Sequence, residues 1–186
     1  MAKCSVFIAT SLDGFISRSD GSIDWLDEAN KMIPAGEDCG FAAFMASVDV
    51  LVMVRNNFEQ VLSFGEWAYV STPVVVLSRN LKALPQQAPA TVSLSAESPK
   101  DVVQRLSAKG RQHLYVDGGL TIQSFLAAGL MDEITITLIP VLLGSGKALF
   151  GVLPKDVPLE LVESKAYDFG FVQSKYRVLH QMAHKA

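Results

Sequence analysis

Short apolar runs, rich in valine and isoleucine, recur along the chain and are separated by glycine, proline and aspartate. Several of these runs are almost continuously apolar, which is typical of strands whose two faces are both covered. Runs of this length and composition predict strands rather than helices. The expected strands before Pro140 are Cys4–Thr10, Val48–Val54, Pro73–Ser78, Thr91–Leu94, His113–Val116 and Glu133–Ile139.

Apolar residues at helical spacing lie between the expected strands. Ser98 can cap a helix and Pro99 suits the first helical position, so a helix is expected to begin there and to stop at Gly110. A second helix is expected over 121–129 and a third over 38–47. The third helix would place three apolar side chains on its inner face: Phe41, Phe44 and Met45.

The pattern changes after Pro140. Apolar and polar residues alternate over Leu159–Ala166 and again over Phe171–Leu179, and residues 167–170 can turn the chain between them. This alternation predicts an antiparallel hairpin. Because strands and helices alternate before it, we expect a single α/β domain over residues 1–186. Its sheet would be mostly parallel, with helices on both faces, and the hairpin would complete it.

The composition excludes several classes of protein. Of the 186 residues, 49% are hydrophobic, and 16 Lys and Arg against 19 Asp and Glu give a net charge of −3. Such a chain is too apolar to be disordered. It also lacks the surplus of positive charge that general binding to nucleic acids or membrane surfaces requires. Any anionic ligand must therefore be held by a few local donors.

Cysteines and histidines give no sign of a disulfide framework or a metal site. The two cysteines are Cys4 and Cys39, and the three histidines have no spacing typical of metal ligands. No run approaches the roughly 18 apolar residues that a membrane span needs, and the N-terminal run is too short for a secretory signal. We therefore expect a cytoplasmic protein that binds no metal.

Four candidate loops follow the carboxyl ends of expected strands, which is where open α/β sheets bind their ligands. The first loop is Thr10–Ile16, in which Asp13 and Gly14 bend the chain. In the second and third, Arg55 and Ser78-Arg79 directly follow apolar strands. Two guanidinium groups at neighbouring strand ends could hold one phosphate group between them.

The fourth loop is the most specific of the set. Gly118 and Gly119 follow a strand and lead directly into a helix. Paired glycines let the backbone approach a ligand closely, and the amides at the helix start can donate to a pyrophosphate. The loop lacks the third glycine of the usual dinucleotide-binding fingerprint.

Each loop also has a plainer interpretation. Any one of them, taken alone, fits an ordinary turn. Arg55 could be a solvated charge and Asn57 a helix cap. Asp132 and Glu133 could act as an acid–base pair, but before a strand they fit a solvated turn better.

In this order, the four loops resemble the dihydrofolate reductase-like superfamily, and especially the reductase domain of the bifunctional riboflavin-biosynthesis deaminase-reductases (the RibD C-terminal domain). The resemblance runs from about Cys4 to Val178. Its motifs are Ser11-Leu12-Asp13-Gly14, Arg55, Ser78-Arg79, Asp117-Gly118-Gly119, Gly129-Leu130-Met131-Asp132-Glu133 and Pro140-Val141-Leu142-Leu143-Gly144-Ser145-Gly146. It implies an eight-stranded, mostly parallel sheet with a C-terminal antiparallel hairpin.

The resemblance further implies NADPH as the cofactor. Ala9 and Ile16 would border the nicotinamide, and Gly118-Gly119 would lie against the pyrophosphate. The adenosine 2′-phosphate would face Arg55, Ser78 and Arg79. The start of the following helix would contribute the remaining donors: Leu120, Thr121 and Ile122. Asn57 stands where the family usually has a threonine that contacts phosphate, and its amide can still donate a hydrogen bond.

By the same resemblance, the activity would be NADPH-dependent reduction of a small pterin- or pyrimidinone-like heterocycle by hydride transfer. Asp38 or Asp13 would orient the substrate or a proton-donating water. The substrate would lie near Trp25, Phe41, Pro140 and Leu143, and a homodimer is expected. Because Val54 and Asn57 depart from the family pattern Gly-Arg-x-Thr, the alternative is a non-catalytic small-molecule-binding protein that retains the reductase fold.

Overall fold

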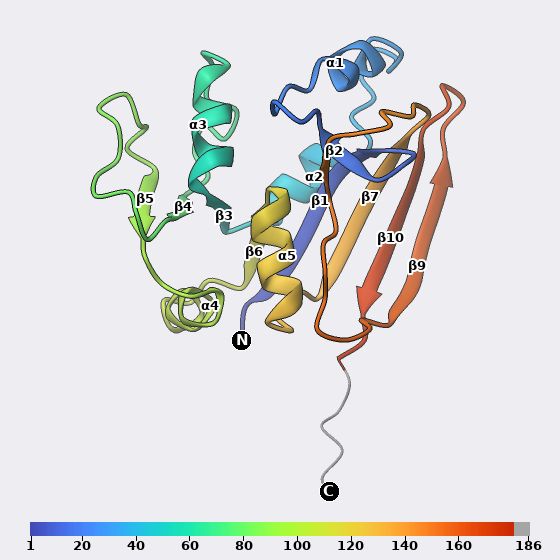
Figure 1. Cartoon of the computed structure of the whole chain (residues 1–186). Helices are drawn as coiled ribbons and strands as arrows, with labels where there is room; N and C mark the ends of the chain where they lie inside the picture. Colours follow the sequence, from blue (N-terminus) through green and yellow to red (C-terminus); the bar gives the residue numbers. More distant parts are fainter. Residues whose placement is uncertain (181–186) are drawn as a thin grey trace, which may run out of the picture.

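The computed structural model describes residues 1–180, so the C-terminal end of the expected 1–186 domain lies outside it. Its centre is an eight-stranded sheet (Figure 1). From one edge to the other, the strands are β5 (Val92–Ser95), β4 (Val74–Leu77), β3 (Val50–Val54), β6 (His113–Asp117), β1 (Lys3–Ser11), β7 (Glu133–Ile139), β10 (Val172–Val178) and β9 (Leu159–Ala166).

The strand directions confirm the expected topology. The pairs from β5 to β7 are all parallel, whereas β10 pairs with β7 and with β9 in the antiparallel direction. The hairpin formed by β9 and β10 turns at residues 167–170, as the alternation in the sequence indicates. The structure is therefore the expected mostly parallel sheet with a C-terminal antiparallel hairpin.

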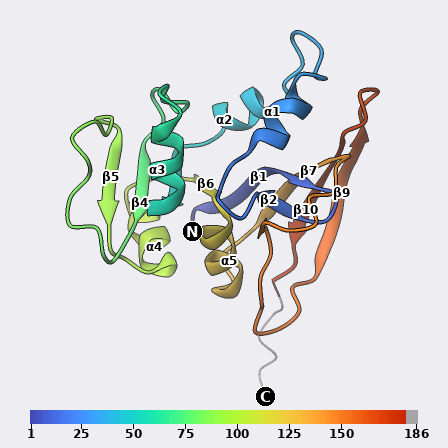
Figure 2. The same ribbon diagram turned by 45° about the horizontal axis from the view of Figure 1, so that its top comes forward.

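Helices cover both faces of the sheet (Figures 1 and 2). The side chains of β3 alternate between the two layers of packing. Val50 and Val52 belong to a core shared with α4 (Pro99–Ala108) and α5 (Gly119–Ala127). Leu51 and Met53 point the other way, into a core that includes Phe58 of α3 (Arg55–Ser63) and is flanked by α2 (Phe41–Ala46). The continuous apolar run of β3 is explained by this two-sided burial.

Helix α4 forms where the sequence predicts it. Pro99 occupies its first turn, and the hydroxyl of Ser98 accepts a hydrogen bond from the backbone N–H of Asp101 at 3.3 Å. Its inward residues Val102, Val103 and Leu106 are all buried. The capping residues and the helical spacing were sufficient to predict this helix, because both are local properties of the chain.

Helix α2 differs from the expectation. It begins at Phe41 rather than Asp38, and Gly40, with φ +84°, is its N-cap residue. The Asp38 carboxylate lies before the helix and accepts hydrogen bonds from the backbone N–H groups of Gly40 and Ala42, both at 2.8 Å. Phe41 is 39% exposed, but its ring contacts Phe7 of β1, and Phe44 and Met45 pack against the core as expected.

Two short strands and helix α1 (Asp24–Asn30) were not expected. Strand β2 (Phe15–Ser17) pairs with β8 (Lys147–Ala148) across a long sequence separation. Strands this short carry no readable periodicity, so only the tertiary contact defines them. Among the residues that the structure describes, no helix has the length and apolar character needed to cross a bilayer.

Candidate active site

A cleft of about 660 Å³ opens over the carboxyl ends of β1, β3 and β6. Its walls come from α1, α3, β2, the first turn of α5 and residues 147–151, and they include apolar side chains such as Phe7, Leu26 and Val61. Within residues 1–180, only two charged side chains line the cleft, Asp117 and Lys147. The volume and the largely apolar lining are typical of a site for a small organic ligand.

The paired glycines shape one end of this cleft. Gly118 has φ +88°, and a Cβ atom there would lie 3.1 Å from Cγ of Asn57. A Cβ atom on Gly119 would lie 2.9 Å from Cδ1 of Ile16 and 3.3 Å from the carbonyl oxygen of Ala148. A side chain at either position would force a neighbouring side chain to shift, and at Gly118 the positive φ disfavours it as well. The backbone of Gly118 and Gly119, directly after β6, therefore lines the cleft without side chains of its own.

Helix α5 begins at Gly119, so its first N–H groups have no acceptor within the helix. The first intrahelical bond is donated by Ile122 to the carbonyl of Gly118 at 2.9 Å. Because the positive end of the helix dipole lies at the same place, this helix start suits an anionic group such as a pyrophosphate. Leu120 is 62% exposed and lines the cleft beside it.

The side chains of Thr121 and Ile122 serve the core instead of the cleft. Both are completely buried. The hydroxyl oxygen of Thr121 accepts a hydrogen bond from the backbone N–H of Val54 at 3.0 Å, which joins α5 to the end of β3. The backbone N–H of Ile122 already donates to the carbonyl of Gly118. The backbone N–H of Thr121, in the first helical turn, has no acceptor within the helix and is the one of the two that could donate to a cofactor.

The two arginines follow neighbouring strands. Val54 and Leu77 are register partners in the parallel pair β3–β4, so Arg55 and Ser78 come next at the same edge of the sheet. The guanidinium of Arg55 lies 3.7 Å from Glu59 in an exposed pair, which holds it only weakly. Ser78 accepts a hydrogen bond from the backbone N–H of Leu81 at 3.0 Å and caps the turn that carries Arg79.

A carboxyl group that the sequence analysis left without a role lies on the floor of the cleft. Asp117 accepts hydrogen bonds on Oδ2 from the Asn57 amide at 2.7 Å and from the Tyr69 hydroxyl at 3.3 Å. Burial raises the pKa of Asp117 above its ordinary value, although the hydrogen bonds from Asn57, Tyr69 and the Gly118 N–H oppose this rise. Its place directly before paired glycines at a strand end was the available signal.

The carboxylates of Asp13 and Asp38 have other partners and do not line the cleft. Asp13 accepts hydrogen bonds from the Ser11 hydroxyl at 2.6 Å and from the backbone N–H of Gly144 at 2.7 Å, and so ties the first loop to residues 143–144. The Ser11 bond lowers the pKa of Asp13, and the N–H of Ala42 lowers the pKa of Asp38. Both groups stay ionised at neutral pH, which does not suit proton donation.

The residues expected near the substrate lie outside the cleft as well. Trp25 is 5% exposed and packs with Ile139 and Phe171, and Leu143 lies against the same cluster. Phe41 contacts Phe7 from α2, with ring centroids 5.6 Å apart, and Pro140 is exposed. Helix α1 instead presents its next residue, Leu26, to the cleft. Ala9, Ile16 and Asn57, by contrast, do line it.

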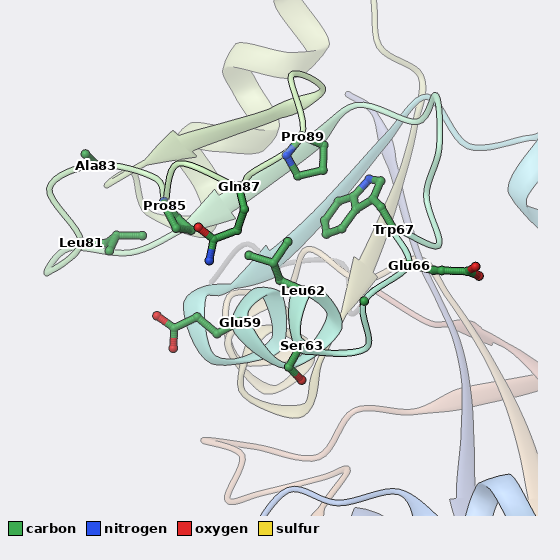
Figure 3. Close-up of a pocket in the computed structure, with 11 residues that line it drawn as sticks. Glu59, Leu62, Ser63, Glu66, Trp67, Leu81, Ala83, Pro85, Gln87 and Pro89 are labelled. Atoms are coloured by element: carbon green, nitrogen blue, oxygen red, sulfur yellow. The ribbon is translucent and has the colours of Figure 1, made fainter.

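A second hollow, of about 690 Å³, lies between α3 and the loop over residues 81–89 (Figure 3). Its labelled side chains include Trp67 and Pro89, together with the carboxylates of Glu59 and Glu66. Among the residues that the structure describes, two carboxylates and no cation line it, so it would repel a phosphate group. The strand-end cleft is therefore the better candidate for an anionic cofactor.

Comparisons with known proteins agree with the fold. The family model described as the RibD C-terminal domain matches residues 2–173. The chain is 33% identical over 172 residues to "Uncharacterized protein YwjB" of Bacillus subtilis (strain 168), which covers 89% of this chain and 92% of that protein.

Solved structures are similar over almost the whole chain. A putative riboflavin biosynthesis protein from Shewanella sp. PV-4 is 42% identical, with a TM-score of 0.90 over 97% of this chain and 100% of that one. A diaminohydroxyphosphoribosylaminopyrimidine deaminase/5-amino-6-(5-phosphoribosylamino)uracil reductase from Thermotoga maritima shares the fold at 16% identity and a TM-score of 0.69, over 96% of this chain and 57% of that one. The chain therefore belongs to the RibD C-terminal domain family.

Proposed function

We propose that the protein is an NADPH-dependent oxidoreductase that reduces a small pterin- or pyrimidinone-like heterocycle. The observation that carries this proposal is the single cleft that joins a glycine-paired helix start to a buried carboxyl group between apolar walls. The reductase named among its structural relatives belongs to the same fold and supports the same class of reaction.

The residues present fit the cofactor. The amides at the start of α5 would hold the pyrophosphate, because the first N–H groups of this helix have no acceptor within it. Arg55, Ser78 and Arg79, at neighbouring strand ends, would hold the 2′-phosphate. Ala9 and Ile16 would border the nicotinamide. When bound, NADPH supplies a hydride to an electrophilic carbon of the substrate.

Reduction of a polarised C=N bond also needs a proton on the nitrogen, so the substrate gains one hydride and one proton and NADP⁺ is released. Asp117 is the carboxyl group placed to supply that proton, because it lines the cleft and its burial favours the protonated form. Phe7, Leu26 and Val61 line the same cleft, and with a ligand bound they would keep water from the space around Asp117. Asp117 would then be reprotonated from solvent.

The first test is cofactor binding. NADPH should raise the melting temperature of the protein and quench the fluorescence of its two tryptophans. A panel of dihydropterins and aminopyrimidinones would then be screened for loss of NADPH absorbance. No thermal shift and no quenching with millimolar NADPH would overturn the proposal, whereas binding without turnover would only reject the substrates tried.

One observation favours a second candidate function. The branched side chain of Val54 lines the cleft at the end of β3, where the family usually has glycine. A non-catalytic protein that binds another small molecule would result if Val54 obstructed the cofactor. The variant Val54→Gly distinguishes the two functions: a gain in NADPH affinity of tenfold or more indicates an obstructed site, and unchanged affinity indicates a competent one.

A further inference from the structure

Asn57 lies in the first turn of α3, and its side chain is bonded within the protein. Its amide nitrogen donates to Oδ2 of Asp117 at 2.7 Å. The same side chain lies against the turn of the paired glycines, since a Cβ atom on Gly118 would be 3.1 Å from Asn57 Cγ and 3.2 Å from its amide nitrogen. Asn57 therefore contacts both the floor carboxyl group and the backbone beside it.

Tyr69 donates to the same carboxyl oxygen. Its hydroxyl lies 3.3 Å from Asp117 Oδ2, so that oxygen accepts from two side chains of different segments. A carboxyl oxygen that already accepts two hydrogen bonds is a poor place for a proton. The proton of a neutral Asp117 is consequently directed to Oδ1, and the two bonds fix the rotation of the carboxyl group.

We infer that Asn57 is a positioning residue for the proposed reduction: it holds Asp117 through Oδ2, so that Oδ1 is the atom that gives up and regains the proton. This inference rests on the proposed function and goes beyond it, because it assigns Asn57 to the proton donor instead of to a phosphate of the cofactor. Asparagine suits this role because its amide donates from a neutral group, whereas an aspartate there would repel Asp117.

The other groups around Asp117 act on it less strongly than Asn57 does. The Gly118 N–H and the Tyr115 hydroxyl also lower the pKa of Asp117 by hydrogen bonding, each by less than Asn57. Tyr115, on the same strand, donates its hydroxyl to the carbonyl of Phe7 at 2.9 Å. Burial raises the pKa of Tyr69, as does the nearby Asp117 carboxylate, so the Tyr69 hydroxyl stays protonated at neutral pH. Lys147 is the one cationic side chain that lines the cleft within residues 1–180, and no hydrogen bond joins it to Asp117.

The direct test is the titration of Asp117 itself, which needs no substrate. The protein is labelled with ¹³C at aspartate carboxyl groups, and the Asp117 signal is assigned by its loss in Asp117→Asn. Removal of the donor in Asn57→Ala should move the titration midpoint to higher pH by about one unit, because the ionised form loses a hydrogen bond. Tyr69→Phe should move it in the same direction by less, since its contact is longer.

Asn56→Ala is the matched control. Asn56 is in the same helical turn and lines the same cleft, but its recorded side-chain contact is with Arg55 at 3.5 Å. This variant should leave the Asp117 titration unchanged. Once a substrate is known, Asn57→Ala should also move the alkaline limb of kcat/KM to higher pH, with NADPH affinity changed less than twofold.

The opposite result is equally clear. An unchanged Asp117 titration in Asn57→Ala, accompanied by a tenfold loss of NADPH affinity, would overturn the inference and make Asn57 a cofactor contact. Failure of the wild-type protein to bind NADPH would overturn the proposed function instead. The two failures are read from different measurements and cannot be confused.

Discussion

The carboxyl ends of the parallel strands and the C-terminal hairpin represent opposite extremes of packing. At the strand ends, a carbon atom added to Gly118 or Gly119 would force a neighbouring side chain to shift, and Asp117 is held by two other side chains. In β9, every residue is exposed, and the ion pair between Arg177 and Glu160 lies in solvent. Both regions belong to one sheet, but only the first is shaped closely enough to select a ligand.

This contrast predicts that equivalent substitutions will have unequal effects in the two regions. The largest is expected at Asp117. Asp117→Asn keeps the shape but removes the ionisable proton, so turnover should fall on the order of 100-fold while NADPH affinity stays nearly constant. Steady-state kinetics with separate NADPH titration measure both quantities, and a variant that retains full turnover would exclude Asp117 as the proton donor.

The same variant tests the raised pKa of Asp117 through stability. Between the unfolded pKa, near 3.8, and the higher folded pKa, the native state binds more protons than the unfolded state. The wild-type free energy of unfolding therefore falls, relative to that of Asp117→Asn, as pH rises through this window. Urea unfolding of both proteins at several pH values measures the difference between their free energies of unfolding. If Asp117 had its ordinary pKa, this difference would not change with pH in this window.

A smaller effect is expected at the glycines. Gly118→Ala and Gly170→Ala both place a side chain at positive φ, +88° and +96°, and each should cost about 1–3 kcal/mol of stability. At Gly118 the new methyl group also meets Asn57, whereas the nearest atom at Gly170 is Pro140 Cγ at 3.5 Å. NADPH affinity should fall at least about tenfold only in Gly118→Ala. Equal affinities in the two variants would contradict the assignment of the glycines to the cofactor.

The arginines are expected to matter less than the glycines. Arg55→Ala and Arg79→Ala should each weaken NADPH binding by up to about tenfold and NADH binding hardly at all, because only NADPH carries the 2′-phosphate. Arg177→Ala, in the hairpin, removes a comparable exposed cation and is the control. If all three variants lost NADPH affinity equally, net charge and not a phosphate site would be responsible.

The smallest effect on the cleft is expected from the hairpin. Leu161 is 57% exposed on β9, and Leu161→Lys should leave NADPH affinity unchanged. The homodimer expected from the resemblance remains a prediction, and the exposed apolar residues of β9 are where it can be tested. Sedimentation of the wild type and the variant would show whether the added charge converts a dimer into a monomer. Loss of NADPH binding in Leu161→Lys would contradict the expectation that the hairpin and the cleft are independent.

Much of the fold could be predicted because it is set by short-range pattern. The run Val50–Val54 must be buried on both faces, so it predicts a central strand with helices on either side. Ser98 and Pro99 define the start of α4 through their own backbone preferences, and alternation along β9 and β10 predicts a hairpin. These signals need no knowledge of what else the residues contact.

The site was predicted only in part, since it depends on distant segments. The paired glycines were singled out from a loop at a strand end, and Ala9 and Ile16 from the family resemblance; all four line the cleft. The sequence alone did not show that Asn57 would face Asp117, which lies 60 residues away, or that Ile16 and Ala148 would meet at Gly119. It also could not indicate that Leu26, and not Trp25, faces the cleft.

The sequence by itself determined the strands of the eight-stranded sheet, the turn of the hairpin and the loops that follow the strand ends, because hydrophobic periodicity and backbone preferences act locally. Only the tertiary structure decided which carboxyl group lies in the cleft. Asp13 and Asp38 accept backbone hydrogen bonds and stay ionised, whereas Asp117 is surrounded by side chains from other elements, and burial there raises its pKa. Desolvation depends on everything packed around a group, so it has no local sequence signal.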